Sequence, residues 1–175
     1  MRSILVCTAL LTLGCAPRAA GQVVVPDRDR VLTAAREVMA AARYATLVTI
    51  GEDGQPEARI VDPFPPEDGL VIWIGTNPLT RKVRQIEGDP RVTLLYFDAT
   101  GLSYVTLVGR AEPVTDPDAK RRHWKEEWAG FYPDGPQSEG YLLLRVMPSR
   151  LEISSSRHGL TNDRRTWRPV ILELP

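Results

Sequence analysis

The sequence has little cysteine and little histidine, and their positions exclude several kinds of site. Both cysteines, Cys7 and Cys15, lie at the start of the 175-residue chain. A mature chain that starts near Gln22 would therefore contain no thiol, which excludes disulfides, thiolate nucleophiles and cysteine-ligated metals. The two histidines, His123 and His158, stand in different segments. We therefore expect neither a metal site nor a haem site built on paired histidines.

The chain also lacks an excess of either charge. Its 22 Lys and Arg residues are balanced by 22 Asp and Glu residues. Proteins that bind nucleic acid through its phosphates usually carry a positive excess, so nucleic acid is not an expected partner. The length fits a single domain that is large enough to bury a core.

The first residues have the pattern of an export signal. Arg2 precedes an apolar run from Ile4 to Leu13, which is too short to span a bilayer as a helix and leads into small residues. We predict a signal peptide over residues 1–21 and an exported protein that is periplasmic or secreted. The alternative is a lipoprotein signal that ends before Cys15, and only its lipidation would attach the protein to the envelope membrane.

Residues 27–175 have the pattern of one mainly β domain. Asp27 is a candidate N-cap for an amphipathic helix, and Asp53-Gly54 is a hairpin turn between two apolar strands. Further strands are expected in GLVIWIGT, RVTLLYFD, SYVTLVGRAEPVT, GYLLLRVMPSRLEI and RPVILEL. Two more helices are expected, in LTRKVRQIEG and after Asp116-Pro117, the latter placing Trp124 and Trp128 at helical spacing in the core. This pattern suggests a small antiparallel barrel of six or so strands with three helices between them.

Three residues, Thr80, Arg81 and Lys82, stand where the second helix would begin. A helix N-terminus carries partial positive charge, so cations in its first turn are unfavourable unless an anion is bound there. The residues alone leave two interpretations open: a solvated helix start, or a site that holds a phosphate. In either case the helix should turn three apolar residues toward the core: Leu79, Val83 and Ile86.

This stretch resembles a motif of the pyridoxamine 5'-phosphate oxidase-like family, the FMN-binding split barrels, and particularly its general stress protein branch. The matching residues are Thr76-Asn77, Thr80-Arg81-Lys82 and Gln85-Ile86. Upstream, ARIVDPF resembles the Arg-x-Val strand of the family, and the resemblance runs from about Val31 to Ile153 in the family's order. It implies an α+β fold, a six-stranded antiparallel split β-barrel with flanking helices, and a homodimer that holds FMN between its subunits.

The resemblance also implies which residues bind the cofactor. Its phosphate would be held by Arg59, Thr80, Arg81 and Lys82. The remaining candidates are Gly75 and Thr76 near the ring and ribityl chain, together with Ile60, Val61, Tyr104 and Arg164. No catalytic residue and no metal ligand is expected, because a bound flavin carries the hydride chemistry itself.

Two departures from the family pattern bear on the substrate. Phe64 stands where the true oxidases carry a substrate-binding Lys, and Tyr104 stands where they place a flavin-contacting Gln. We therefore expect a flavin-dependent oxidoreductase that acts on an unknown small molecule and is not a true pyridoxine phosphate oxidase. Two alternatives stay open: a non-enzymatic flavin-binding stress protein, and a deazaflavin-dependent reductase on the same fold.

The predicted signal can be tested by intact-mass measurement of the protein from envelope fractions. The mature chain should begin near Gln22 after cleavage behind Ala19-Ala20-Gly21, or at a lipidated Cys15. A cytoplasmic protein that still carries Met1 or Arg2 would contradict this expectation.

Overall fold

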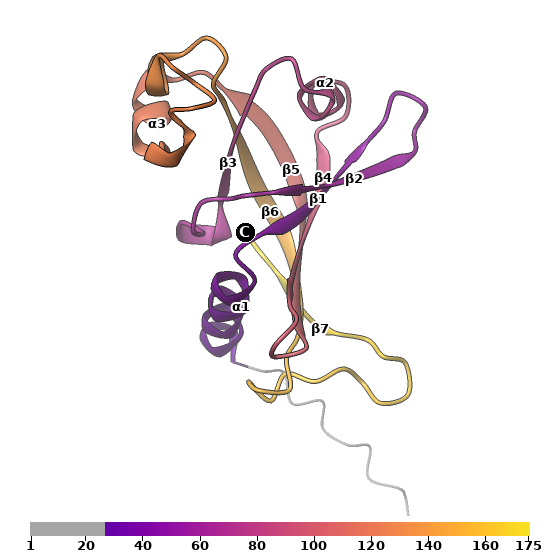
Figure 1. Ribbon diagram of the computed structural model, residues 1–175. Coiled ribbons are helices and arrows are strands. Elements are labelled where there is room, and N and C mark those ends of the chain that lie inside the picture. The colour runs from indigo at the N-terminus through magenta and orange to yellow at the C-terminus, as the bar shows by residue number, and fades with distance from the viewer. Residues whose placement is uncertain (1–26) are drawn as a thin grey trace, which may run out of the picture.

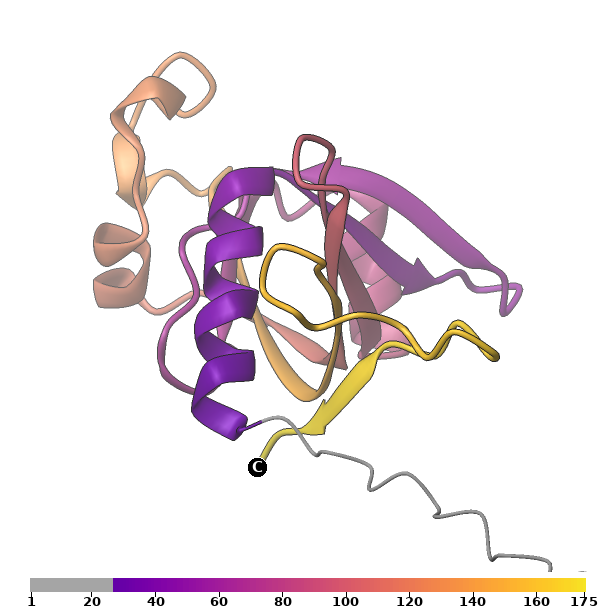
Figure 2. The same cartoon turned by 90° about the horizontal axis from the view of Figure 1, so that it is seen from below.

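The computed structural model describes residues 27–175, so the predicted export signal lies outside the described residues. An antiparallel sheet curls into a half-barrel, with helices flanking it (Figures 1 and 2). Within the described part of the chain, no helix has the length and hydropathy that a bilayer span requires.

The sheet has the strand order β2-β1-β4-β5-β6-β3, and β7 pairs with β6 beside this path. The elements are α1 (Arg28–Ala42), β1 (Ala45–Ile50), β2 (Pro56–Val61), η1 (Asp68–Leu70), β3 (Ile72–Thr76), α2 (Arg81–Gly88), β4 (Arg91–Asp98), β5 (Ser103–Val114), α3 (Pro117–Arg122), η2 (Glu126–Trp128), η3 (Gly135–Gln137), β6 (Leu142–Ser154) and β7 (Val170–Glu173). The long strand β6 pairs with β3 along its first half and with β7 near its end. The predicted split barrel with flanking helices is confirmed.

Helix α1 forms as its sequence pattern predicts. The Asp27 side chain accepts from the backbone N–H of Asp29 and caps the helix. Its apolar face is buried, and the helix packs beside β4 and β5 at one end of the sheet (Figures 1 and 2). The buried residues of this face are Val31, Ala34, Ala35, Val38 and Met39.

Helix α2 also forms as predicted, with Val83 and Ile86 buried. The prediction that Leu79 faces the core is wrong, because its side chain is 87% exposed. The helix begins only at Arg81, and Leu79 belongs to the preceding turn. There its backbone N–H donates to the Asn77 side chain at 2.8 Å, which turns the chain before the helix starts.

The connection between β5 and β6 differs from the predicted long helix. Helix α3 starts at its predicted cap, since the Asp116 carboxylate accepts from the Ala119 N–H at 2.7 Å, but it ends at Arg122. The next residue, His123, stacks on Trp73 of β3 with ring centroids 4.4 Å apart, and this contact takes the chain out of the helical path. The two tryptophans that follow still pack inward, in a second apolar cluster over β3.

Candidate functional site

Arg59 on β2 is held in place by a small hydrogen-bond network. Its guanidinium donates to the Thr49 hydroxyl at 2.5 Å and to the Gln85 side-chain oxygen at 2.9 Å. The Thr49 hydroxyl also donates to the same Gln85 oxygen, at 2.6 Å. Burial lowers the pKa of Arg59, and the neighbouring charge of Arg81 lowers it further, against the opposing effect of Glu57. The network therefore fixes a partly desolvated cation between the β1–β2 hairpin and α2.

Lys82 places a second cation beside the first. Burial lowers the pKa of Lys82, and the charge of Arg59 adds to the effect. Within residues 27–175, no carboxylate lies within ion-pair distance of its ammonium group. Two partly buried like charges that disfavour each other favour the binding of an anion between them.

The start of α2 adds backbone donors to this region. Thr80 is the N-cap, but its hydroxyl makes no capping hydrogen bond; it donates instead to the Asn77 carbonyl at 2.9 Å and lies 3.4 Å from the Thr76 hydroxyl. The first turn contains no acidic residue. The positive end of the helix is therefore not neutralised by its own first turn.

A cavity of about 430 Å³ opens beside Lys82. It is bounded by the end of β2, by β3 and by the aromatic connection between β5 and β6. Its lining residues are Ile60, Val61, Asp62, Gly75, Asn77, Lys82, Trp128, Phe131 and Tyr132. Four of the predicted cofactor residues thus line one cavity, next to Arg59 and the start of α2.

Two of the lining residues, Gly75 and Asp62, determine the shape and the charge of this cavity. Gly75 lies directly under the Trp128 and Tyr141 rings, and a Cβ there would come within 2.9 Å of a Tyr141 ring carbon. Asp62 is paired with Lys125, with its carboxylate 2.8 Å from the ammonium group. The cavity therefore has an aromatic wall and an acidic group that is already neutralised.

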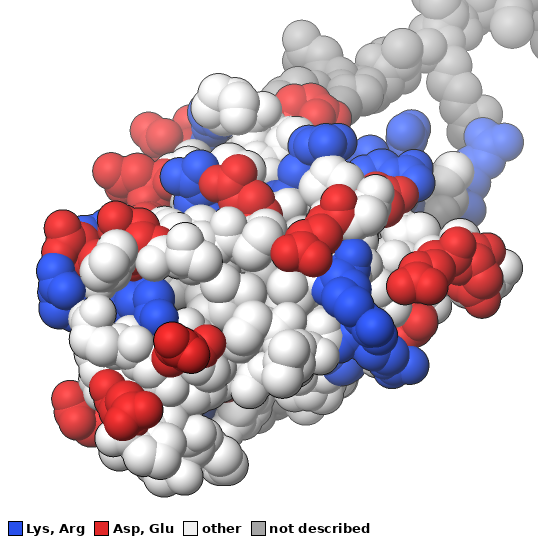
Figure 3. All heavy atoms as spheres, turned by 90° about the horizontal axis from the view of Figure 1, so that it is seen from above, with Lys and Arg blue, Asp and Glu red and all other residues white. Residues whose placement is uncertain are grey.

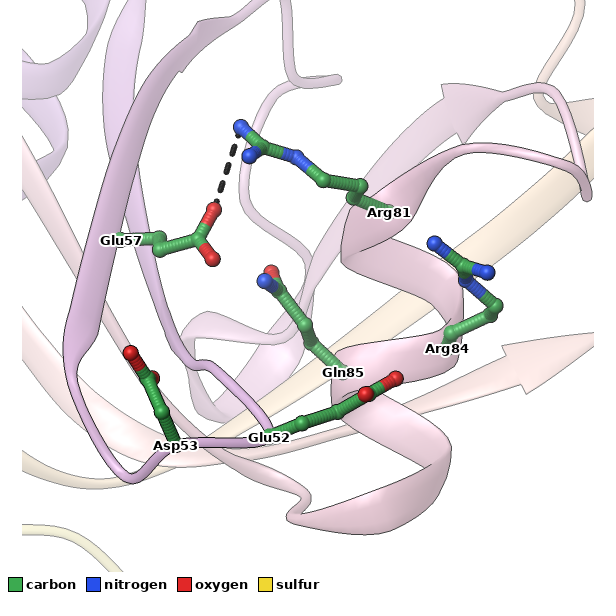
Figure 4. A pocket seen from close by; sticks show the side chains of 6 residues that line it. All are labelled: Glu52, Asp53, Glu57, Arg81, Arg84 and Gln85. Atoms are coloured by element: carbon green, nitrogen blue, oxygen red, sulfur yellow. Dashed lines mark ion pairs between the residues drawn. The ribbon is translucent and has the colours of Figure 1, made fainter.

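Arg81 points elsewhere, into a second hollow of about 260 Å³ (Figure 4). The hollow is lined by Glu52, Asp53, Glu57, Arg81, Arg84 and Gln85. The Arg81 guanidinium lies 3.1 Å from the Glu57 carboxylate, as the dashed line in Figure 4 marks. On the surface seen from above, basic and acidic groups accordingly lie side by side next to a broad uncharged area (Figure 3).

Three other predicted residues lie apart from the cavity lining. Thr76 is buried on β3, where only its hydroxyl faces Thr80. Tyr104 opens β5, three strands from β2, which is about 14 Å at the usual strand spacing. Arg164 is exposed in the segment after β6. A single chain therefore does not bring Tyr104 or Arg164 to the cluster around Lys82.

Several residues of the site carry no role in the sequence prediction. Glu57 lies two residues before Arg59, so the two side chains share one face of β2, and this spacing could have indicated their 3.6 Å ion pair. Thr49 is recognisable only once β1 and α2 are in contact, and Gln85, which the family motif includes, is seen as the acceptor of Arg59 only in the folded chain. Trp128 was predicted as core; it packs on Gly75 and also lines the cavity.

Comparison with known proteins gives the chain's relatives. A sequence profile described as pyridoxamine 5'-phosphate oxidase matches residues 31–154. General stress protein 26 of Bacillus subtilis is 26% identical over 123 residues, which are 69% of this chain and 85% of that protein.

Solved structures share the fold. A Clostridium acetobutylicum protein related to general stress protein 26 superposes with a TM-score of 0.70 at 18% identity, over 84% of this chain and 96% of its own. A pyridoxamine 5'-phosphate oxidase-related, FMN-binding protein of Nostoc punctiforme superposes with a TM-score of 0.55 at 17% identity, over 75% and 86% of the two chains. At these identities the superpositions establish the fold alone.

The positive charge of Lys82 lies in an unfavourable environment, and this leads to a prediction about the stability of the fold. Lys82→Met should raise the melting temperature of the ligand-free protein by about 2–4 °C, because it removes a half-buried charge that Arg59 repels. The pKa of Lys82 is lower in the folded chain than in the unfolded chain, where it has its usual value of 10.5. The stability of wild type should therefore rise as the pH increases from the folded-state pKa toward 10.5. The difference in melting temperature between Lys82→Met and wild type should therefore become smaller over that pH range.

Arg84→Met is the matched control, since Arg84 is exposed on the same helix. Thermal melts of the three proteins from neutral to alkaline pH provide the measurement. A Lys82 variant that melts below both wild type and the control would show that Lys82 stabilises the fold, contrary to this account.

Proposed function

The chain belongs to the pyridoxamine 5'-phosphate oxidase family, and from this membership we propose that it binds FMN and acts as an exported flavin-dependent oxidoreductase on a small substrate. The observation that carries the proposal is that two cations, Lys82 and Arg59, lie close together beside the aromatic cavity. An anion between these cations would relieve their repulsion and accept from the first turn of α2. The phosphate of FMN supplies that anion, and its ring supplies a flat body for the cavity.

Each part of the site has a role in this proposal. Arg59, Lys82 and the Thr80 hydroxyl bind the phosphate, and the hydrogen bonds from Arg59 to Thr49 and Gln85 keep its guanidinium oriented. The apolar walls of the cavity bury the ring and exclude water from one side of it. When bound, the flavin accepts or donates a hydride, and the chain contributes binding and orientation.

We further propose that two copies of the chain complete the site. Exposed apolar side chains are spread over the outer face of the sheet, and the strand register places polar residues between them. Ile60 on β2, Leu95 on β4 and Ile171 on β7 are exposed. Phe97 lies on the same face and is also exposed. Exposed apolar side chains gathered on one face of a sheet favour an interface there.

The second copy also explains the two residues that stand apart. Tyr104 and Arg164 are too far along the sheet to reach the flavin of their own chain. Packing of the outer faces would bring them from the partner toward the ring, consistent with the role that the resemblance gives them.

A second candidate function is flavin binding without catalysis. It is favoured by the state of Asp62, the one carboxylate among the residues that line the cavity, whose pairing with Lys125 leaves it no free role as an acid or base. Oxidation of reduced nicotinamide by the flavin-loaded protein, in the presence of an electron acceptor, would distinguish the oxidoreductase from the binding protein. A deazaflavin is the alternative cofactor, and it can be titrated in the same way.

The phosphate site is tested by titrating FMN and riboflavin into wild type, Lys82→Met and Arg84→Met. Loss of one charge-assisted contact to phosphate should weaken FMN binding on the order of 10- to 100-fold. Riboflavin lacks the phosphate, so its affinity should change less than about threefold. Flavin fluorescence quenching gives both dissociation constants.

The Arg84 control should bind both ligands as wild type does. Equal FMN affinity in wild type and the Lys82 variant would return this stretch to a solvated helix start, and the phosphate site would have to be sought elsewhere.

The chain should not oxidise pyridoxine or pyridoxamine phosphate efficiently. Phe64 is packed edge-on against the His123 and Trp128 rings, so its position is apolar. The ammonium of Lys125 lies 5.0 Å from the Phe64 ring but is paired with Asp62, which leaves no free cation for a substrate phosphate there. Peroxide production from either vitamer should stay near background in a steady-state assay of FMN-loaded protein; robust turnover would refute this specificity.

A further inference from the structure

We propose that Glu57 is a built-in competitor for the ligand phosphate. In the ligand-free chain its carboxylate takes the place of the anion at Arg81 and reaches Arg59, so FMN must displace it to bind. The inference rests on the proposed function, and it makes FMN an exchangeable ligand of this protein rather than a permanently held one.

The geometry places one carboxylate between two of the predicted phosphate ligands. The same Glu57 oxygen, Oε2, lies 3.1 Å from the Arg81 guanidinium and 3.6 Å from the Arg59 guanidinium. Glu57 and Arg59 are two residues apart on β2, so their side chains lie on the same face of the strand. Arg81 reaches this face from the first turn of α2 (Figure 4). The carboxylate therefore bridges the strand and the helix start in the manner expected of a bound anion.

The bridge is loosely made. Glu57 Oε2 is shielded from solvent yet lacks a partner with hydrogen-bond geometry, so its contact with Arg81 is an ion pair without a well-directed hydrogen bond. The Arg81 side chain is 70% exposed, and ion pairs that are this open to water are weak. A phosphate, which offers more acceptor oxygens and more charge, can compete for the same guanidinium.

Neighbouring acidic groups prevent Glu57 and a phosphate from sharing the cations freely. Glu52 and Asp53, at the tip of the β1–β2 hairpin, line the same hollow as Glu57 and Arg81. A phosphate that engages Arg81 would face three carboxylates across this hollow, and like charges at short range oppose its binding. The acidic hairpin therefore lowers the affinity for the phosphate group and leaves the flavin ring unaffected.

Glu57 does not compete with the phosphate for Lys82. Lys82 has no carboxylate within ion-pair distance in the described chain and lines the cavity rather than the acidic hollow. A phosphate can first contact Lys82 and the start of α2, and then draw Arg81 away from Glu57. Of the three cations, Lys82 thus lines the cavity, whereas Arg59 and Arg81 lie beside Glu57.

The test is Glu57→Gln, with Glu52→Gln as the matched control from the same hollow. Loss of a partly exposed competing ion pair should tighten FMN binding about three- to tenfold, with riboflavin unchanged within about twofold. The Glu52 control removes a carboxylate that lines the hollow but forms no ion pair with Arg81 in the described chain, so it should tighten FMN binding by no more than about twofold and leave riboflavin binding unchanged. Because Glu57 must be displaced before FMN binds, the affinity gain of Glu57→Gln should appear mainly as a faster FMN association rate in stopped-flow measurements.

A double-mutant cycle with Arg81→Ala assigns the effect to the pair. In the Arg81→Ala background, Glu57→Gln should bring less than half of its gain in FMN affinity, because the main competing contact is already absent. An equal gain in both backgrounds would show that Glu57 acts only through its general negative charge, which overturns the proposal.

The outcomes separate this inference from the proposed function. If wild type binds FMN and Glu57→Gln binds it equally or more weakly, the competitor role is overturned and the flavin site stands. If wild type binds neither flavin, the proposed function fails, and inorganic phosphate then decides the role of Glu57. Phosphate should raise the melting temperature of Glu57→Gln more than that of Glu52→Gln; equal shifts would overturn the competitor.

Discussion

The site depends on one buried polar junction, the side-chain oxygen of Gln85 that accepts from both Thr49 and Arg59. It joins α2 to β1 and β2, which are themselves paired as antiparallel strands. A partly buried guanidinium without such acceptors would be costly, so the junction is what allows this cation to be held at this end of the half-barrel. Antiparallel register makes it possible, because Leu47 pairs with Arg59 and Thr49 with Glu57 along the hairpin.

Everything proposed for the function builds on that fixed cation. The charge of Lys82 is disfavoured by burial and by the neighbouring Arg59, which the network holds in place. Arg81 forms an ion pair with Glu57, which balances its charge. The aromatic connection after α3 adds the other half of the site, since Trp128 closes on Gly75 and leaves a cavity beside Lys82. A polar end for a phosphate and an aromatic space for a ring thereby lie next to each other, which is the arrangement that a flavin mononucleotide requires.

Sequence patterns predicted much of this fold because its determinants are local. The caps at Asp27 and Asp116, the Asp53-Gly54 turn and the strand alternation all act within a few residues, and each formed as predicted. The errors arose where distant contacts decide the outcome. Leu79 became exposed when Asn77 turned the chain before α2, and α3 ended early because His123 stacks on a strand far away in sequence.

The same distinction applies to the site. Neighbours in sequence such as Arg81 and Lys82 were expected to act together, yet the position of Glu57 on another element separates them. Tyr104 and Arg164 lie far from the cluster in one chain, so the role proposed for them requires a second copy of the chain.

The central claim is that the cluster around Lys82 holds a flavin phosphate. The most direct measurement is the absorbance spectrum of the protein purified from the compartment where it acts, followed by mass analysis of the ligand released on denaturation. The account predicts flavin absorption bands and a released mass equal to that of FMN, or the same bands after FMN is added back. A colourless protein that neither releases a flavin nor takes up added FMN would contradict it.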